Sequence, residues 1–209
     1  LVYIETASSS ASELVTELLM YFGDKVRPTR LDATALYSGV VVDTKNFNVG
    51  AGVRTFDAAA YLRRAGADPV LVRALFQSDY ETTVALARAK ANAEYFAGGL
   101  IVGSIPERLA NGQIIAAQAA DGMLRVDGVR MSIYVFQLPG DVVGISARST
   151  GELNVQVIME AFGGGGHANV AGAQVKGVPL SVVRGNVVER AREYIEESDK
   201  HEGNTAGGR

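Results

Sequence analysis

The apolar positions near the start of the chain follow helical spacing. Between Ser12 and about Phe22 they fall on one helical face, at Leu14, Val15, Leu18, Leu19 and Phe22. A cluster of serines precedes this segment and Gly23 follows it, as expected for a helix start and stop. Two further helices are predicted, from about Thr55 to Ala65 and from Asp68 to Phe76, the latter with Pro69 in its first turn.

One short segment in this part of the chain has a different pattern. Val40–Val42 is a run of β-branched residues, which is typical of a buried strand, and it ends at Asp43. A helix, a strand and two more helices in succession indicate a fragment of a parallel α/β domain.

The second half of the chain alternates strand-like and helix-like segments. Strands are predicted at Leu100–Ile105, Met131–Leu138, Val142–Ala147 and Val170–Val175, and helices at Ile114–Leu124, Asn154–Phe162 and Leu180–Ile195. A turn at Pro139–Asp141 joins the second and third strands. The predicted fold class is therefore α/β: a partial parallel-sheet domain followed by a smaller mixed-sheet α/β (α+β) domain.

Composition and charge narrow the functional classes. The chain has no cysteine, which excludes disulfides and thiolate metal sites and fits a cytoplasmic protein. Its net charge of −3 argues against binding long duplex nucleic acid but not against a small anionic ligand. No apolar run is long enough to span a membrane. Leu1–Ile4 is predicted to be an apolar strand or extended segment, and it lacks an initiator methionine, so we expect the chain to be part of a larger protein.

The strongest local signal is the glycine run Gly163–Gly166 followed by His167. Four consecutive glycines are entropically costly, but they let the backbone approach a ligand closely and direct its amides inward, as in phosphate nests. The imidazole can donate to a phosphate or transfer a proton. The alternative is a flexible linker with an incidental histidine, which its place between a helix and a strand makes less favourable.

Two more candidates stand at predicted strand ends. Arg148, followed by Ser149, is suited to bidentate phosphate recognition, although a surface ion pair is the commoner role for such an arginine. Asp43 is a candidate ligand for a hard divalent cation, because ligands gather at the carboxyl ends of strands in open α/β sheets. A turn or capping role for Asp43 is equally consistent with the pattern. Glu13 is interpreted as closing a capping box with Ser10.

These segments resemble the DHH-family phosphoesterases. Gly164–His167 with the following Ala171-Gly172 resembles the hallmark of their DHH-associated C-terminal domain. The segments Tyr3–Leu18, Ile115–Asp121 and Gly144–His167 are similar, in the same order, to GdpP-type cyclic di-AMP phosphodiesterases. The likeness extends to about residue 197.

The resemblance implies a domain organisation and a chemistry. Residues 1–78 would be the C-terminal portion of a DHH catalytic domain, 79–97 a helical linker, 98–197 the substrate-binding domain and 198–209 a flexible tail. The reaction implied is manganese-dependent hydrolysis of a cyclic dinucleotide to a linear one, with two ions activating the water.

The resemblance also assigns roles to residues. Asp43 matches a metal-binding, catalytic aspartate. Arg148 and His167 match positions that engage the substrate's phosphate and nucleotide, with Gly164–Gly166 packed against it and Ser149 adjacent.

The sequence departs from the family in what it lacks. The Asp-His-His triplet and the other upstream aspartates that hold most of the metal are absent, so we expect this polypeptide alone not to form the dimetal centre. Two alternatives stay open: an oligoribonucleotide or single-strand exonuclease of the same superfamily, and a non-catalytic nucleotide-binding module. Homodimer formation, membrane attachment of the parent protein and the preferred dinucleotide are left undetermined.

Overall fold

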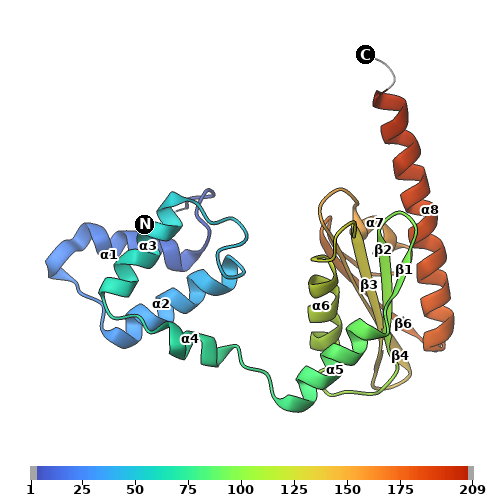
Figure 1. The fold of residues 1–209 in the computed structure, drawn as a ribbon, viewed down its shortest axis with the longest axis horizontal. Helices are drawn as coiled ribbons and strands as arrows, with labels where there is room; N and C mark the ends of the chain where they lie inside the picture. Colours follow the sequence, from blue (N-terminus) through green and yellow to red (C-terminus); the bar gives the residue numbers. More distant parts are fainter. Residues whose placement is uncertain (1–3, 207–209) are drawn as a thin grey trace. The chain divides into compact units, whose positions relative to one another are not determined.

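A computed structural model describes residues 4–206, except for the side chains of Asp24 and of residues 201–206. The chain forms two compact units, Leu1–Gln77 and Ser78–Arg209, each of which is described by itself (Figure 1). No helix among the described residues is both long enough and apolar enough to cross a membrane.

The described part of the first unit is helical. Its α-helices are α1 (Ala11–Phe22), α2 (Arg30–Asp43), α3 (Val53–Arg64) and α4 (Pro69–Leu75), with a short 3₁₀ turn at Gly23–Lys25. Side chains of Ser10, Thr29 and Asp68 cap the N-termini of α1, α2 and α4 by accepting backbone N–H bonds. A small core of Ala33, Leu62 and Ala67 joins α2 to α3 and the turn that follows it.

The strand predicted at Val40–Val42 is wrong, because these residues form the last turn of α2. A capping box between Thr29 and Asp32 nucleates this helix. Three β-branched residues cost less than about 0.7 kcal/mol each in a helix, and Val40 regains more by its complete burial. The parallel sheet expected in this part of the chain is therefore absent from residues 4–77. Of the extended segment expected at 1–4, residues 1–3 lie outside the described residues.

The second unit contains a six-stranded sheet in the order β1-β2-β3-β4-β6-β5. Its strands are β1 (Glu94–Phe96), β2 (Leu100–Ile105), β3 (Met131–Leu138), β4 (Val142–Ser149), β5 (Gly165–His167) and β6 (Val170–Lys176). Only β2 and β3 pair in parallel, and the other neighbours are antiparallel. The predicted α/β fold class with a mixed sheet is thus confirmed.

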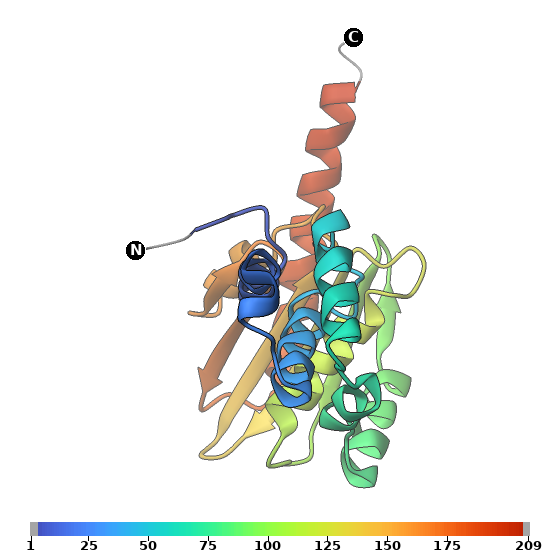
Figure 2. The same ribbon diagram turned by 90° about the vertical axis from the view of Figure 1, so that its left-hand side faces the viewer.

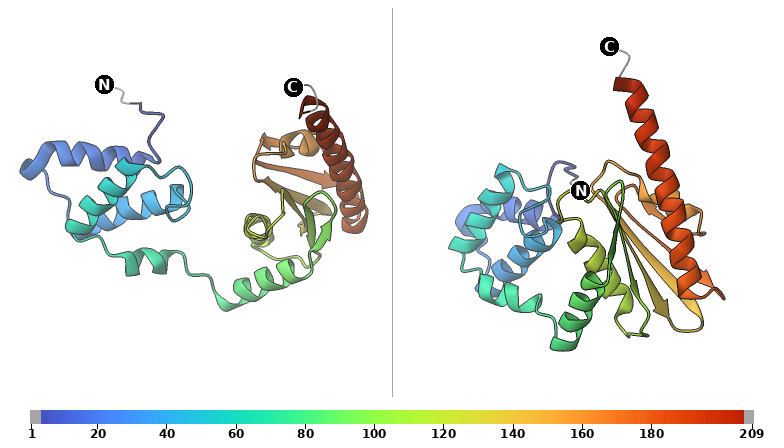
Figure 3. Two further views of the ribbon diagram at one scale, coloured as in Figure 1. Left: turned by 45° about the horizontal axis from the view of Figure 1, so that its top comes forward. Right: turned by 45° about the vertical axis from the view of Figure 1, so that its right-hand side comes forward.

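Helices cover both faces of this sheet, as Figures 1 and 3 show. Helices α5 (Tyr80–Ala91) and α6 (Gly112–Met123) pack on one face, against side chains that include Tyr134 and Phe136. Helices α7 (Val155–Glu160) and α8 (Leu180–Ala206) pack on the other face, over the larger apolar core. Because α5 contributes to the core with α6, it belongs to the second unit.

Most elements predicted for the second half are found with nearly the expected bounds, but two short strands and the chain end differ. Strand β5 forms within the predicted glycine loop, and β1 within the predicted linker. The segment from 198, expected to be a flexible tail, continues α8 as far as Ala206 (Figure 2). Its lack of apolar periodicity reflects a helix that has left the sheet and has nothing apolar to cover.

Glu13 does more than the predicted capping box requires. Its backbone N–H donates to Ser10 Oγ at 3.0 Å, as expected, but its buried carboxylate accepts from Ser9 and from Thr55 Oγ1, the latter at 2.6 Å. Burial raises the pKa of this carboxyl, and the hydrogen bonds from Ser9 and Thr55 outweigh that effect and leave the pKa below its ordinary value. The carboxylate therefore fastens α1 to the first turn of α3.

Replacing Glu13 with glutamine should destabilise the first unit by about 1–3 kcal/mol, because a charged acceptor for two hydroxyl groups is lost. A lowered folded-state pKa contributes stability above the unfolded-state pKa, and this contribution disappears as pH falls through the folded-state value. Chemical denaturation as a function of pH should therefore show a smaller acid-induced loss in the variant. Asp57→Asn, an exposed change in α3, is the control, and equal losses in both variants would contradict the assignment.

Candidate functional site

Three rows of side chains cross strands β4, β6 and β5 on the α6 face of the sheet. Directly paired residues on neighbouring antiparallel strands project to the same face. The rows are Phe136–Gly144–Gln174 (the amide row, which begins on β3), Ser146–Gly172–Gly165 (the small row) and Arg148–Val170–His167 (the cationic row). The small row lies between the other two, so the part of this face that β4, β6 and β5 form has almost no side-chain volume at its middle, whereas Tyr134 fills the adjoining position on β3.

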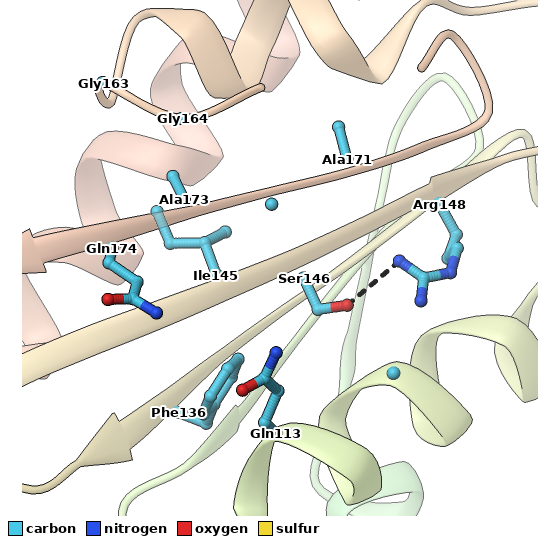
Figure 4. Close-up of a pocket in the computed structure, with 12 residues that line it drawn as sticks. Gln113, Phe136, Ile145, Ser146, Arg148, Gly163, Gly164, Ala171, Ala173 and Gln174 are labelled. Atoms are coloured by element: carbon cyan, nitrogen blue, oxygen red, sulfur yellow. Dashed lines mark hydrogen bonds between the residues drawn. The ribbon is translucent and has the colours of Figure 1, made fainter. Parts of the chain in front are cut away.

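Helix α6 forms a wall beside these rows. Gln113, Ala117 and Asp121 recur at intervals of four residues, which places them along one helical face. Asp121 pairs with Arg148 of the cationic row, and Gln113 lies beside Phe136 of the amide row (Figure 4). The helix face and the sheet face therefore run alongside each other, with alanine opposite the small row.

Between the two faces is a hollow of about 470 Å³. This volume lies within the range of pockets that bind small molecules. Its lining comes from α6, β3, β4, β6 and the glycine run: Gln113, Ala117, Phe136, Ile145, Ser146, Arg148, Gly163, Gly164, Ala171, Gly172, Ala173 and Gln174. Arg148 is the only charged side chain among these described residues, so the hollow has one cationic end.

Arg148 is held in place by three groups. Its Nη1 donates to Ser146 Oγ at 3.1 Å and to the Ala147 carbonyl oxygen at 3.0 Å, and its Nε lies 3.4 Å from Asp121 Oδ1. Only 13% of the side chain is exposed. Within the described part of the chain Nη2 has no partner, so a pre-positioned guanidinium keeps donors available for an anion.

The glycine run begins as a helix C-cap. Gly163 has a φ of +71°, and its N–H donates to the Glu160 carbonyl, while the N–H of Gly164 donates to the Met159 carbonyl. These two bonds form the Schellman motif that ends α7. The amides of Gly163 and Gly164 are therefore used within the chain, and the expectation that they point inward as a phosphate nest is wrong.

The glycines from Gly164 to Gly166 differ in how much space surrounds them. A methyl group at Gly164 would overlap the Gly172 carbonyl oxygen, and one at Gly166, where φ is +148°, would overlap the backbone of Val170. A methyl group at Gly165 would meet nothing. Gly165 belongs to the small row, and the space beside it is open.

The structure brings His167 to the same face as Arg148 but not into the lining. Both residues pair with Val170, His167 from β5 and Arg148 from β4. At about 4.8 Å per strand spacing, their Cα atoms are about 10 Å apart. The imidazole is exposed on the edge strand, where it can reach a ligand that extends beyond the hollow.

Ser149 is not part of this arrangement. It pairs with Met131, whose side chain belongs to the core on the opposite face of the sheet. Its hydroxyl is directed to the Ala168 carbonyl oxygen at 3.4 Å, and the side chain is buried. The hydroxyl that faces the hollow belongs instead to Ser146, three residues earlier.

Comparison with known proteins identifies the fold and the family. Residues 97–198 match the DHHA1 domain family. Over 194 residues the chain is 44% identical to the cyclic-di-AMP phosphodiesterase PdeA of Listeria monocytogenes serotype 1/2a (strain 10403S), a match that covers 93% of this chain and 30% of that protein. Residues 97–198 therefore belong to the DHHA1 domain family, and the chain as a whole resembles the DHH-family phosphodiesterases.

Other relatives agree with this assignment. The cyclic-di-AMP phosphodiesterase GdpP of Geobacillus thermodenitrificans (strain NG80-2) is 44% identical over 196 residues, with 94% of this chain and 30% of that protein covered. The chain thus spans about a third of the length of these relatives. A crystal structure of an exopolyphosphatase-related protein from Bacteroides fragilis has the same fold, with a TM-score of 0.76 at 18% identity, over 94% of this chain and 62% of that one.

The metal expected in the DHH family can be compared with the donors in the first unit. Asp43 is exposed at the C-terminal end of α2, not at the end of a strand. Among the side chains that the structure describes, no three histidine, aspartate or glutamate residues are grouped so that they could hold a metal ion. The described donors therefore do not fit a two-manganese centre by themselves.

Sequence reasoning missed the wall and the amide row of the DHHA1 hollow. Gln113, Phe136 and Gln174 come from three elements, and no local motif connects them. The four-residue spacing from Gln113 to Asp121 was a usable signal, but only once α6 was known to lie beside β4. Only the strand register shows that Gly172 lies in the small row and that the Phe136 ring covers Gly144.

Alanine substitutions should distinguish Gly164, which packs closely against Gly172, from Gly165, which has open space beside it. Gly164→Ala should lower the free energy of unfolding by about 1–3 kcal/mol, because the methyl group forces backbone apart. Gly165→Ala should change it by less than about 0.5 kcal/mol. Denaturant unfolding of both variants measures the difference, and equal destabilisation would contradict the packing described for Gly164.

Proposed function

We propose that this chain is the substrate-binding part of a phosphodiesterase that hydrolyses cyclic di-AMP to the linear dinucleotide. The observation that carries the proposal is the pre-positioned guanidinium of Arg148 at one end of an open hollow in the DHHA1 domain. The names of the relatives, cyclic-di-AMP phosphodiesterases at 44% identity, support the choice of ligand.

The phosphate would lie at the cationic row. Arg148 would donate from Nη2, Ser146 would contribute its hydroxyl at the floor, and His167 would reach the ligand from the edge strand. A guanidinium already held by Asp121 and Ser146 loses little side-chain freedom on binding, which favours affinity. Asp121 also offsets part of the positive charge, so the site would suit a single phosphodiester better than a highly charged polyphosphate.

The shape of the hollow supports a short ligand. A volume of about 470 Å³ accommodates one nucleotide and part of a second. A long single strand would need a groove that tracks its backbone with repeated positive charges. Among the described lining residues Arg148 alone carries a charge, which favours a dinucleotide over the exonuclease alternative.

For the intact parent protein we propose a manganese-dependent reaction in which Asp43 supplies one carboxylate ligand. The position of Asp43 supports a functional role. A negative charge at the C-terminal end of a helix opposes the helix dipole, at a cost of about 0.3–1 kcal/mol, and the last turn of α2 contains no basic residue.

Removing the arginine side chain tests the phosphate contact. Arg148→Ala should weaken binding of linear diadenylate by about 1.5–3 kcal/mol, because a charge-assisted hydrogen bond is lost. Isothermal titration calorimetry with the linear and the cyclic dinucleotide measures this effect. Arg125→Ala removes an exposed arginine outside the hollow and should leave binding unchanged. Unaltered affinity in a folded Arg148 variant would remove the assigned role.

The isolated chain should bind nucleotide without turning it over. When the chain is incubated with manganese and cyclic di-AMP, we expect no linear product above the uncatalysed level, because Asp43 belongs to no group of three potential metal ligands among the described residues. Anion-exchange chromatography of the nucleotides measures conversion. Rapid hydrolysis would show that this chain assembles a complete catalytic centre.

A further inference from the structure

The end of the hollow opposite Arg148 has its own chemistry. The amide row and the cationic row are four residues apart along β4, from Gly144 to Arg148, which corresponds to about 13 Å at about 3.3 Å per residue. Figure 4 shows Gln174 and Arg148 at opposite ends, with Ser146 between them. A ligand anchored by its phosphate at Arg148 would therefore extend along the small row toward the glutamines.

Two amide side chains meet at this neutral end. Gln113 enters from α6 and Gln174 from β6, and both line the hollow. Both side chains are exposed, and neither makes a hydrogen bond within the described part of the chain. Each amide offers one acceptor and two donor hydrogens. Two unpaired amides beside one cavity are suited to the edge of a heterocycle that itself alternates donors and acceptors.

An aromatic ring closes the floor between the glutamines. Phe136 pairs with Gly144, and its ring occupies the space that a side chain at Gly144 would fill. The ring is buried, with 3% of the residue exposed, yet it contributes to the lining of the hollow. A flat apolar floor with amides beside it is the environment of a nucleobase, whose faces are apolar and whose edges are polar.

We infer that Gln113, Gln174 and Phe136 form the base subsite of this DHHA1 domain and select adenine. A glutamine amide can bond in bidentate fashion to the N6 donor and N7 acceptor of adenine, whereas guanine is most often read by arginine or lysine, which this end lacks. The inference rests on the proposed function, because it assumes that a phosphate occupies the Arg148 end. It adds the residues that orient the nucleotide and determine its base.

The full chain can be titrated with adenosine 5′-monophosphate, guanosine 5′-monophosphate and ribose 5-phosphate. Adenosine monophosphate should bind most tightly and should shift the NMR signals of the side-chain amides of Gln113 and Gln174. Gln113→Ala and Gln174→Ala should each weaken its binding about 3–10-fold, while ribose 5-phosphate binding stays the same. Gln118→Ala, an exposed glutamine of α6 outside the lining, is the matched control.

The outcomes separate this inference from the proposed function. If Arg148→Ala weakens binding of both phosphates but the two glutamine variants leave adenosine monophosphate binding intact, the base subsite is wrong and the phosphate contact stands. Equal affinity for adenosine and guanosine monophosphates in the wild-type chain would overturn the choice of adenine. If neither phosphate binds, or Arg148→Ala has no effect on either, the proposed function fails and the base subsite fails with it.

Discussion

The hollow in the second unit depends on a row of missing side chains. On a mixed sheet covered by helices, interior positions are normally filled to high density. Here Ser146, Gly172 and Gly165 cross three strands at the same level, and Ala117 lies on the wall beside them. Helix α6 and the sheet therefore stay packed at their shared edge while the space between them remains open. A larger side chain at Ser146, Gly172 or Ala117, which line the cavity, would occupy part of it.

The two ends of this cavity differ in charge, and that difference gives a ligand one orientation. Arg148 is oriented by Asp121 and by Ser146 before any ligand arrives, so the cationic end is pre-organised. The opposite end has neutral amides and the ring of Phe136 over Gly144. The helix and the strand are aligned because two intervals match in length. Gln113, Ala117 and Asp121 recur every four residues along α6, and Gly144, Ser146 and Arg148 recur every two residues along β4. Four residues of a helix rise about as far as two residues of a strand.

The local sequence pattern indicated candidate residues but not the contacts that these residues make. Arg148 and the first two glycines of the run line one cavity, whereas Gly165, Gly166 and His167 are not among its lining residues. The phosphate-nest interpretation does not hold for Gly163 and Gly164, because these two residues use their amides to end α7. The strand prediction at Val40–Val42 failed for a related reason. A three-residue pattern cannot outweigh a helix that is nucleated ten residues earlier by Thr29 and Asp32.

The sequence by itself determined the periodic elements of the second half, the α/β class and the family resemblance. These depend on local spacing and on short motifs, both of which can be recognised in the sequence. Only the tertiary structure decided which residues share the cavity. Strand register sets the face on which each side chain lies, and a slip of one residue would exchange Arg148 for Ser149. The pairing of β4 with β6 joins strands that are separated in the chain by α7 and β5, so local spacing does not specify which residues of β6 lie beside Arg148.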